Sequence, residues 1–180
     1  MNSDQFHISN MISSMLLNND DINNFYKNSS NWSSCGGYVL SNLIAKYSLA
    51  SDLYYVTECA YTFLKDNNLI DNTGRVLRGS KRRKKSEISW EHAIPSCVIR
   101  DYLLNNMSSI SKSDIENVLS LSDYVVAVCK EDNCILNENG YMASMPGDWK
   151  LFEDSWSARY TESGIKILDF TIPMYGVVCR

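Results

Sequence analysis

The chain has 180 residues and a mass of 20.5 kDa, and 44% of its residues are hydrophobic, so it can bury a sizeable core as one domain or as one domain with a small satellite. This composition excludes a disordered tail and a fibrous repeat. The formal net charge is −4, but seven of the seventeen basic residues lie between positions 75 and 85, with no acid among them. The other ten basic residues stand against 21 acids, so the rest of the chain carries a net charge of −11.

We call residues 75–85 the basic segment; its cations are Arg75, Arg78, Lys81, Arg82, Arg83, Lys84 and Lys85. Because the field near a surface follows local charge, this segment is expected to attract anions although the protein as a whole is acidic. Cations at this density can neutralise several phosphates of a nucleic acid, and such binding weakens steeply with salt. The alternatives are a solvated loop and a segment that docks on acidic groups of the protein itself or of a protein partner.

The N-terminus, MNSDQFHISNMISSMLLNNDD, has neither the basic start nor the cleavage site of a signal peptide, and no stretch has the roughly 18 to 20 apolar residues of a membrane span. The sequence therefore predicts a cytoplasmic protein with no membrane contact. In a reducing compartment the six cysteines are expected to be thiols, with Cys59, Cys97 and Cys129 as small core residues. Cys129 and Cys134 offer an alternative sulfur site for zinc, but no second Cys or His pair has zinc-finger spacing.

The first 70 residues have helical patterns. Apolar residues at positions 8, 11, 12, 15 and 16 share one helix face, and a short helix is expected over 22–26 after a capping aspartate. Residues 35–48 form the next amphipathic stretch. A third helix is expected to start at Ser51 and to turn Leu53, Val56, Ala60, Phe63 and Leu64 inward.

Strand patterns follow the basic segment. Ile88 and Trp90 alternate with polar residues up to Pro95, a helix is predicted from Ser96, and Ser113 with Glu116 has the spacing of a capping box. The apolar run 123–130 is typical of a strand in the centre of a sheet. A helix over 130–139 closed by Gly140, a helix ending at Gly164, and strands over 165–170 and 175–180 complete the chain.

We therefore predict an α+β fold with a helical N-terminal half and a small sheet with flanking helices in the C-terminal half. Residues 1–180 are expected to form a single domain. A possible sub-division has a helical part over 1–70 and an α+β part over 87–180, with a basic loop over 75–86 between them.

Of the two histidines, only His92 has a patterned setting, because Glu91 precedes it and Pro95 follows it at the third position. The string SWEHAIPSCVIRD resembles the first strand and turn of HNH endonucleases, the ββα-metal family, over about 15 residues. The resemblance implies that His92 is a general base and that Glu91 helps to hold Mg²⁺ or another divalent metal. It also requires a later ligand. Asn105, Asn106 and Asn133 are the candidates, and Asn106 is the one taken into the predicted set.

This resemblance gives the basic segment a purpose, because Arg78, Lys81, Arg82, Arg83, Lys84 and Lys85 would hold the backbone of the DNA or RNA substrate. Phosphate contacts of this kind carry no sequence information. A histidine that only donates to a backbone carbonyl at the end of a strand, with Glu91 in solvent, is the structural alternative.

A second hypothesis starts from Cys35, which lies at the start of a predicted helix, where the helix dipole stabilises a thiolate. Cys35, His92 and Asp101 follow the order of a papain-like triad, which would make the protein a thiol hydrolase. The local string also resembles the nucleophile segment of ubiquitin-like-protein peptidases, in which the histidine precedes the cysteine.

A third hypothesis is a non-enzymatic protein that binds, or inhibits by binding, a nucleic acid or nucleoprotein. The aromatic and charged segment MPGDWKLFEDSWSARY, with Trp149, Trp156 and Arg159, can line a cleft or cover an edge of the sheet.

Overall fold

The computed structural model describes residues 1–17, 35–51, 53–76 and 87–173 of the chain. The chain divides into two compact units, one of residues 1–51 with 96–123 and the other of residues 52–95 with 124–180. We call the first the helical unit and the second the sheet unit. The chain passes between them after residues 51, 95 and 123, rather than once near the basic segment.

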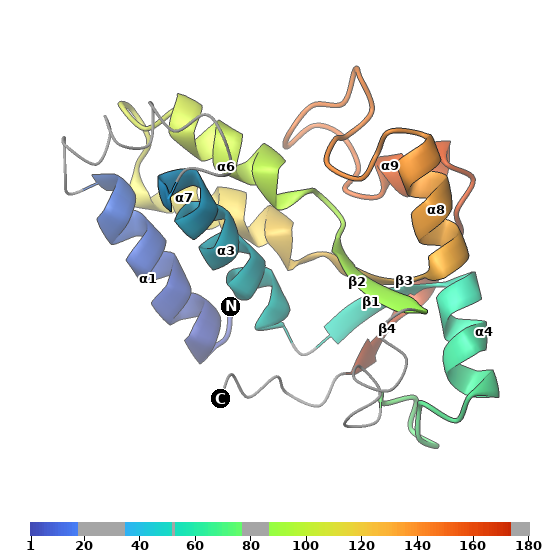
Figure 1. The fold of residues 1–180 in the computed structure, drawn as a ribbon. Coiled ribbons are helices and arrows are strands. Elements are labelled where there is room, and N and C mark those ends of the chain that lie inside the picture. Colours follow the sequence, from blue (N-terminus) through green and yellow to red (C-terminus); the bar gives the residue numbers. More distant parts are fainter. Residues whose placement is uncertain (18–34, 52, 77–86, 174–180) are drawn as a thin grey trace. The chain divides into compact units, whose positions relative to one another are not determined.

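The helical unit contains α1 (Ser3–Leu17), α3 (Cys35–Leu49), α6 (Ser96–Asn105), α7 (Lys112–Ser120) and the 3₁₀ turn η1 (Leu121–Asp123). Helix α3 packs against α1 and α6, and α1 also contacts α7 (Figure 1). The helices bury apolar side chains that recur every three or four residues, among them Ile12, Leu16, Leu40, Ile44, Ile99, Leu103, Ile115 and Leu119. The helical patterns expected over 8–16, 35–48 and from Ser96 are confirmed, whereas the short helix over 22–26 lies outside the described residues.

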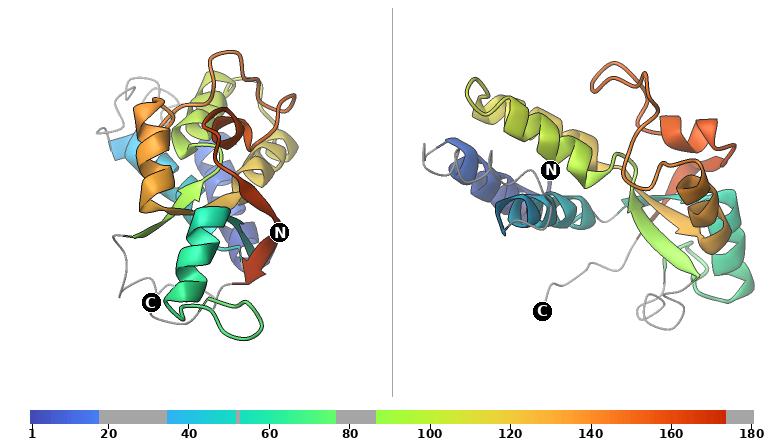
Figure 2. Two further views of the ribbon diagram at one scale, coloured as in Figure 1. Left: turned by 90° about the vertical axis from the view of Figure 1, so that its right-hand side faces the viewer. Right: turned by 45° about the horizontal axis from the view of Figure 1, so that its top comes forward.

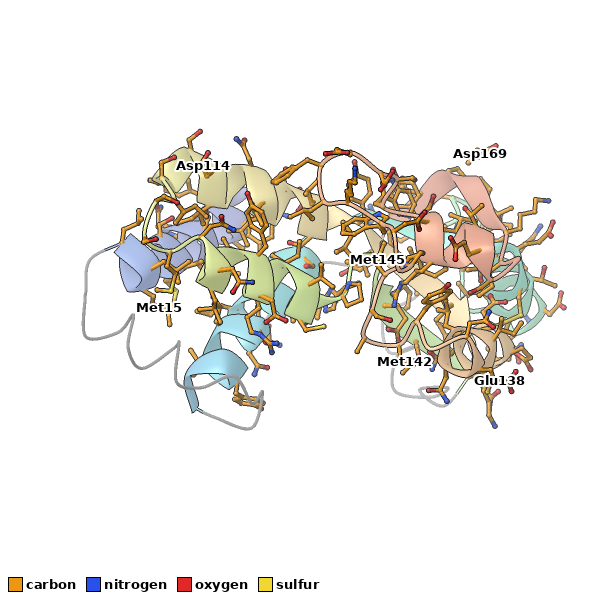
Figure 3. All side chains as sticks on the ribbon, turned by 90° about the horizontal axis from the view of Figure 1, so that it is seen from above. Met15, Asp114, Glu138, Met142, Met145 and Asp169 are labelled. Atoms are coloured by element: carbon orange, nitrogen blue, oxygen red, sulfur yellow. A yellow bond between two sulfur atoms is a disulfide. The ribbon has the colours of Figure 1, made fainter. Side chains whose placement is uncertain are left out.

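The N-cap of helix α7 is Ser111, two residues before the Ser113 that the sequence pattern predicted. The Ser111 hydroxyl accepts a hydrogen bond from the Asp114 N–H at 3.2 Å, and the Asp114 carboxylate accepts one from the Ser111 N–H at 2.9 Å. Asp114 is labelled at this helix start in Figure 3. The expected pair of Ser113 and Glu116 is therefore wrong, because aspartate three residues after Ser111 completes the same reciprocal box.

The sheet unit is built on β1 (Leu53–Thr57), β2 (Ile88–His92), β3 (Val125–Cys129) and β4 (Ile167–Pro173), in the order β2-β3-β1-β4. Strands β1 and β3 are parallel, and the two outer strands pair antiparallel to them. The helices of this unit are α4 (Glu58–Asp66), α8 (Lys130–Glu138) and α9 (Ala158–Glu162). The α+β fold class is confirmed, as are the expected strands 88–94 and 123–130 and the helix closed by Gly140, which has a φ of +79°.

The helix expected from Ser51 is wrong in its first half, because residues 53–57 form β1 and the helix α4 starts only at Glu58. Tyr54 to Thr57 is a run of aromatic and β-branched residues, which suits a strand equally well. Residues 53–57 form a strand rather than a helix because Tyr55 and Val56 pair with β3, which lies about 70 residues later in the chain. Strands therefore occur before the basic segment as well as after it, although the sequence pattern placed them only after it.

Strand alternation gives the sheet two faces with different contents. Trp90 and His92 lie on one face with Tyr54, whose ring meets that of Trp90 edge to face at 5.3 Å. Glu91 lies on the other face, opposite Val126. This second face carries a buried cluster of Ala93, Val126, Val128, Leu136, Tyr160 and Ile165.

Helices α4 and α8 start at the same edge of the sheet. Each follows one of the two parallel strands directly, α4 after β1 and α8 after β3 (Figure 2). Thr57 caps α4 by accepting a hydrogen bond from the Ala60 N–H, and Cys129 caps α8 by accepting one from the Asp132 N–H through its sulfur. Two helix N-termini and their backbone N–H groups are thereby brought together.

Candidate functional site

His92 ends β2 and is partly buried. Burial, followed by the positive charge of Arg159, lowers its pKa from 6.5 to about 4, so the imidazole is neutral at pH 7. Its Nδ1 atom is buried and has no hydrogen-bond partner among the described residues. Nδ1 thus makes no hydrogen bond to a backbone carbonyl of the described residues, and the structural alternative, a ring that donates to a backbone carbonyl at the strand end, stays a hypothesis for the other ring nitrogen.

Glu91 is the neighbour of His92 on β2, but its side chain lies on the opposite face of the sheet. Burial raises the pKa of its carboxyl group, and the nearby guanidinium of Arg159 works against this rise. The two adjacent residues thus have pKa values shifted in opposite directions. Groups with shifted pKa values gather at functional sites, although structural ion networks shift them too.

Arg159 links Glu91 and His92, because its charge acts on both groups. It lies in α9, is only 1% exposed, and donates hydrogen bonds to the carbonyl oxygens of Tyr141 and His92 and to the Tyr160 hydroxyl. Its Nε has no partner among the described residues. A buried cation with an unused donor next to a half-buried carboxyl group is the most unusual electrostatic feature of the sheet unit.

Tyr160, whose hydroxyl accepts a hydrogen bond from Arg159, lines a pocket of about 540 Å³ on the sheet unit. Burial raises the pKa of Tyr160 to about 12, so its hydroxyl keeps its proton. The pocket is also lined by Tyr55 and Trp156, whose rings lie 4.6 Å apart, and by Asp169, which is labelled in Figure 3. Trp156 stacks on Tyr124 at 4.7 Å as well. Trp156 of the aromatic and charged segment thus lies in the wall of this pocket.

The other predicted site residues lie outside the described residues or belong to the helical unit. Arg78, Lys81, Arg82, Arg83, Lys84 and Lys85 lie outside the described residues. Asn106 and Asp101 belong to the helical unit, whereas Glu91 and His92 belong to the sheet unit. The Asn106 amide donates to the Tyr102 carbonyl oxygen, and Asp101 pairs with Arg100 at 2.6 Å. Cys35 begins α3, and its side chain lies outside the described residues.

Among the described residues, one group of three side chains has the spacing of a metal site, and it does not include Glu91. The ligating atoms of Cys59, Cys129 and Asp132 lie within 4.8 Å of one another. The two sulfurs are joined in a disulfide, so they are not free thiolate ligands in this structure. The metal-like spacing in the sheet unit is therefore that of a disulfide beside an aspartate, and the Glu91 and Asn106 predicted for Mg²⁺ belong to different units.

The disulfide corrects the sequence prediction for two cysteines. Cys129 is a buried core residue as expected, but Cys59 is exposed, and the two are bonded although they lie 70 residues apart in the chain. Cys97 and Cys134 are not part of a disulfide. The pairing arises because α4 and α8 start at the same edge of the sheet, which no local pattern reveals.

Sequence reasoning also missed Arg159, Tyr160 and Asp132 as interacting groups. Arg159 and Tyr160 were expected only within an aromatic surface segment, and Asp132 only within a helix. The sequence does show Arg159 and Tyr160 side by side, shortly after Trp149 and Trp156. This pattern does not indicate which side chains of the short helix α9 face the sheet.

Comparison with models of known protein families gives no match, and comparisons with curated proteins and with solved structures give none either. None of the helices in residues 1–17, 35–51, 53–76 and 87–173 combines the length and the hydrophobicity that a membrane span requires. The function is therefore inferred from the chemistry of the residues alone.

Proposed function

We propose that the protein is a nuclease that hydrolyses phosphodiester bonds of DNA or RNA, with His92 as the general base. The observation that carries the proposal is the state of the His92 ring, which is neutral at pH 7 and has an Nδ1 without a hydrogen-bond partner among the described residues. A general base must be unprotonated, and most buried side-chain nitrogens in folded proteins have a hydrogen-bond partner, so an unpartnered Nδ1 is compatible with a role beyond the fold.

The pKa of about 4 makes His92 a weak base in the free protein. A phosphate group beside the ring would raise this pKa, because a negative charge favours the imidazolium form. His92 would then take a proton from the attacking water while the new P–O bond forms and the bond to the leaving oxygen breaks. Substrate binding would thus strengthen the base at the moment when it is needed.

Arg159 supports the site as a positioning residue. It binds the backbone carbonyl of His92 and fixes the end of β2, where the ring projects. The basic segment ends three residues before β2 starts. A nucleic acid bound by Arg82, Arg83, Lys84 and Lys85 would therefore be held by residues that are near His92 in the sequence.

A divalent metal such as Mg²⁺ belongs to the proposal through the HNH resemblance. Glu91 can supply one oxygen ligand, but the positive charge of Arg159 opposes a cation there, and no further ligand is assigned. We derive no step through a metal. Its participation is decided in the assay below by comparing Mg²⁺, Mn²⁺ and EDTA.

The test incubates the purified full chain with labelled single- and double-stranded DNA and RNA. We expect cleavage, and a loss of at least about 100-fold in rate for His92→Ala, the size of a general-base contribution. His7→Ala, on the exposed side of α1, is the matched control and should leave the rate unchanged. Neutralising Lys81, Arg82, Arg83, Lys84 and Lys85 with glutamine should weaken binding and reduce its salt dependence.

Two outcomes would reject the enzyme. If the wild-type chain binds nucleic acid but leaves it intact with every metal, the protein is a nucleic-acid-binding protein without this activity. If it neither cleaves nor binds at low salt, both readings of the basic segment as a nucleic-acid contact fail.

A further inference from the structure

We propose that the Cys59–Cys129 disulfide is a thiol-exchange site at which an incoming thiol attacks Cys59, with a preference for cationic or neutral thiols over anionic ones. The proposal is independent of the nuclease activity and of His92. It rests on the unequal exposure of the two sulfurs, on their places at two helix N-termini and on the charges around Cys59.

The two sulfurs of the disulfide differ in their access to solvent. Cys59 is exposed, whereas Cys129 is 1% exposed. Thiol exchange requires the attacking sulfur to approach one disulfide sulfur from outside, so only Cys59 can be attacked while the protein stays folded. Cys129 must then be the sulfur that leaves.

The second feature is the stabilisation of the leaving group. Cys129 is the cap of α8, and its sulfur accepts a hydrogen bond from the Asp132 N–H at 3.4 Å. The positive end of the helix dipole and this N–H both favour a thiolate at Cys129. A sulfur that leaves more easily as a thiolate makes the exchange faster.

The third feature is the group beside the leaving sulfur. A carboxylate oxygen of Asp132 lies within 4.8 Å of both sulfurs, and the Thr57 hydroxyl donates to Asp132 Oδ2 at 2.5 Å. Asp132 is only 8% exposed, so this hydrogen bond holds its carboxyl group beside the Cys129 sulfur and away from bulk water.

The fourth feature concerns the choice of thiol. The Glu131 carboxylate lies 3.8 Å from Cys59 Sγ and is exposed. Glu58, next to Cys59 in the chain, is already paired with Lys166 at 2.8 Å. Glu131 thus leaves a net negative charge beside the attacked sulfur, which repels anionic thiols and attracts cationic ones.

The chemistry balances with two thiols as the reductant. The first thiolate forms a bond to Cys59 Sγ, the Cys59–Cys129 bond breaks, and Cys129 leaves as a thiolate that takes up a proton. A second thiol attacks the mixed disulfide and releases Cys59. Two electrons pass to the protein, and the two thiols become one disulfide.

The test first maps the cysteines of the folded wild-type chain by alkylation and mass spectrometry, before and after dithiothreitol. We expect Cys59 and Cys129 to be protected before reduction and to become reactive without unfolding, as followed by circular dichroism. A pair that is reduced only in denaturant, or that is not bonded in the air-oxidised protein, would overturn the proposal.

The second arm uses Cys129→Ser, which keeps a good helix cap and leaves Cys59 unable to re-form its bond. We expect this variant to form a mixed disulfide at Cys59 with cystamine, the disulfide of a cationic thiol, about tenfold faster than at the exposed Cys134. Reaction with the disulfide of an anionic thiol, mercaptoethanesulfonate, should be slower, and Glu131→Gln should reduce the difference between the two reagents. Equal rates at Cys59 and Cys134, or equal rates for the two reagents, would contradict the proposal.

Discussion

The helical unit and the sheet unit bury polar groups of different kinds. In the described residues of the helical unit, the buried polar side chains are the neutral Gln5, Ser9, Ser13, Ser48 and Ser122. The sheet unit buries Arg159 and Asp132, shifts the pKa values of Glu91 and His92, and contains the Cys59–Cys129 bond. The helical unit also shifts the pKa values of Tyr47 and Asp123 upward through burial, so the contrast lies in the fully buried charged side chains, which among the described residues belong to the sheet unit.

The two units also satisfy these groups differently. In the helical unit, Gln5 donates to Asp123 at 2.6 Å, and the Ser122 hydroxyl donates to the Leu119 carbonyl oxygen at 2.6 Å. In the sheet unit, the Arg159 guanidinium donates hydrogen bonds to the carbonyl oxygens of Tyr141 and His92 and to the Tyr160 hydroxyl. Loss of a single side chain should therefore be far more damaging in the sheet unit than in the helical unit.

The largest expected effect tests this difference directly. Arg159→Ala leaves the Tyr141 and His92 carbonyl oxygens without their donor and opens a cavity, so we expect a loss of about 3–5 kcal/mol in the free energy of unfolding. Arg100→Ala in the helical unit removes a pair with the half-exposed Asp101 and a hydrogen bond to the Ser41 hydroxyl at 3.3 Å, and should cost about 1–2 kcal/mol. Urea unfolding followed by circular dichroism measures both, and equal losses would remove the contrast between the units.

The next effect concerns acid stability. The folded pKa of His92, about 4, lies below its ordinary value of 6.5, so between these values the unfolded chain binds a proton that the folded chain does not. This contribution to stability is complete above pH 6.5 and is lost as the pH falls towards 4, with a total of up to roughly 3 kcal/mol. His92→Gln should flatten the curve of unfolding free energy against pH in this window. His7→Gln in the helical unit is the control, and a curve that keeps its slope in His92→Gln would show that other groups cause it.

The smallest expected effect is an increase in the free energy of unfolding, caused by a substitution in the helical unit. The Ser13 hydroxyl in α1 is buried, and it has no hydrogen-bond partner in the part of the chain that the structure describes. Ser13→Ala removes this unsatisfied group and improves helix propensity, so we expect a stabilisation of about 0.5–1 kcal/mol by urea unfolding. Ser122→Ala breaks a formed hydrogen bond and should instead destabilise the protein by about 1 kcal/mol. A loss of stability in both variants would indicate that Ser13 has a partner in solution.

Much of the fold follows from local patterns. The alternation in 88–92 and the apolar run in 125–129 predicted β2 and β3, and Gly140 marked the end of α8. Leu53 and Val56 share the helical spacing of Ala60, Phe63 and Leu64, which predicts one helix from Ser51, whereas pairing with β3 makes residues 53–57 a strand. Local patterns are reliable where caps and turns accompany the periodicity, and ambiguous where a distant strand makes the choice.

The sequence by itself determined the α+β class, the concentration of charge in the basic segment and the candidacy of Glu91 and His92. Only the tertiary structure decided that these two side chains lie on opposite faces of the sheet, that Arg159 acts on both, and that Cys59 meets Cys129. The physical reason is range: periodicity and caps depend on residues within a few positions, whereas burial, pKa shifts and a disulfide depend on groups brought together from distant parts of the chain.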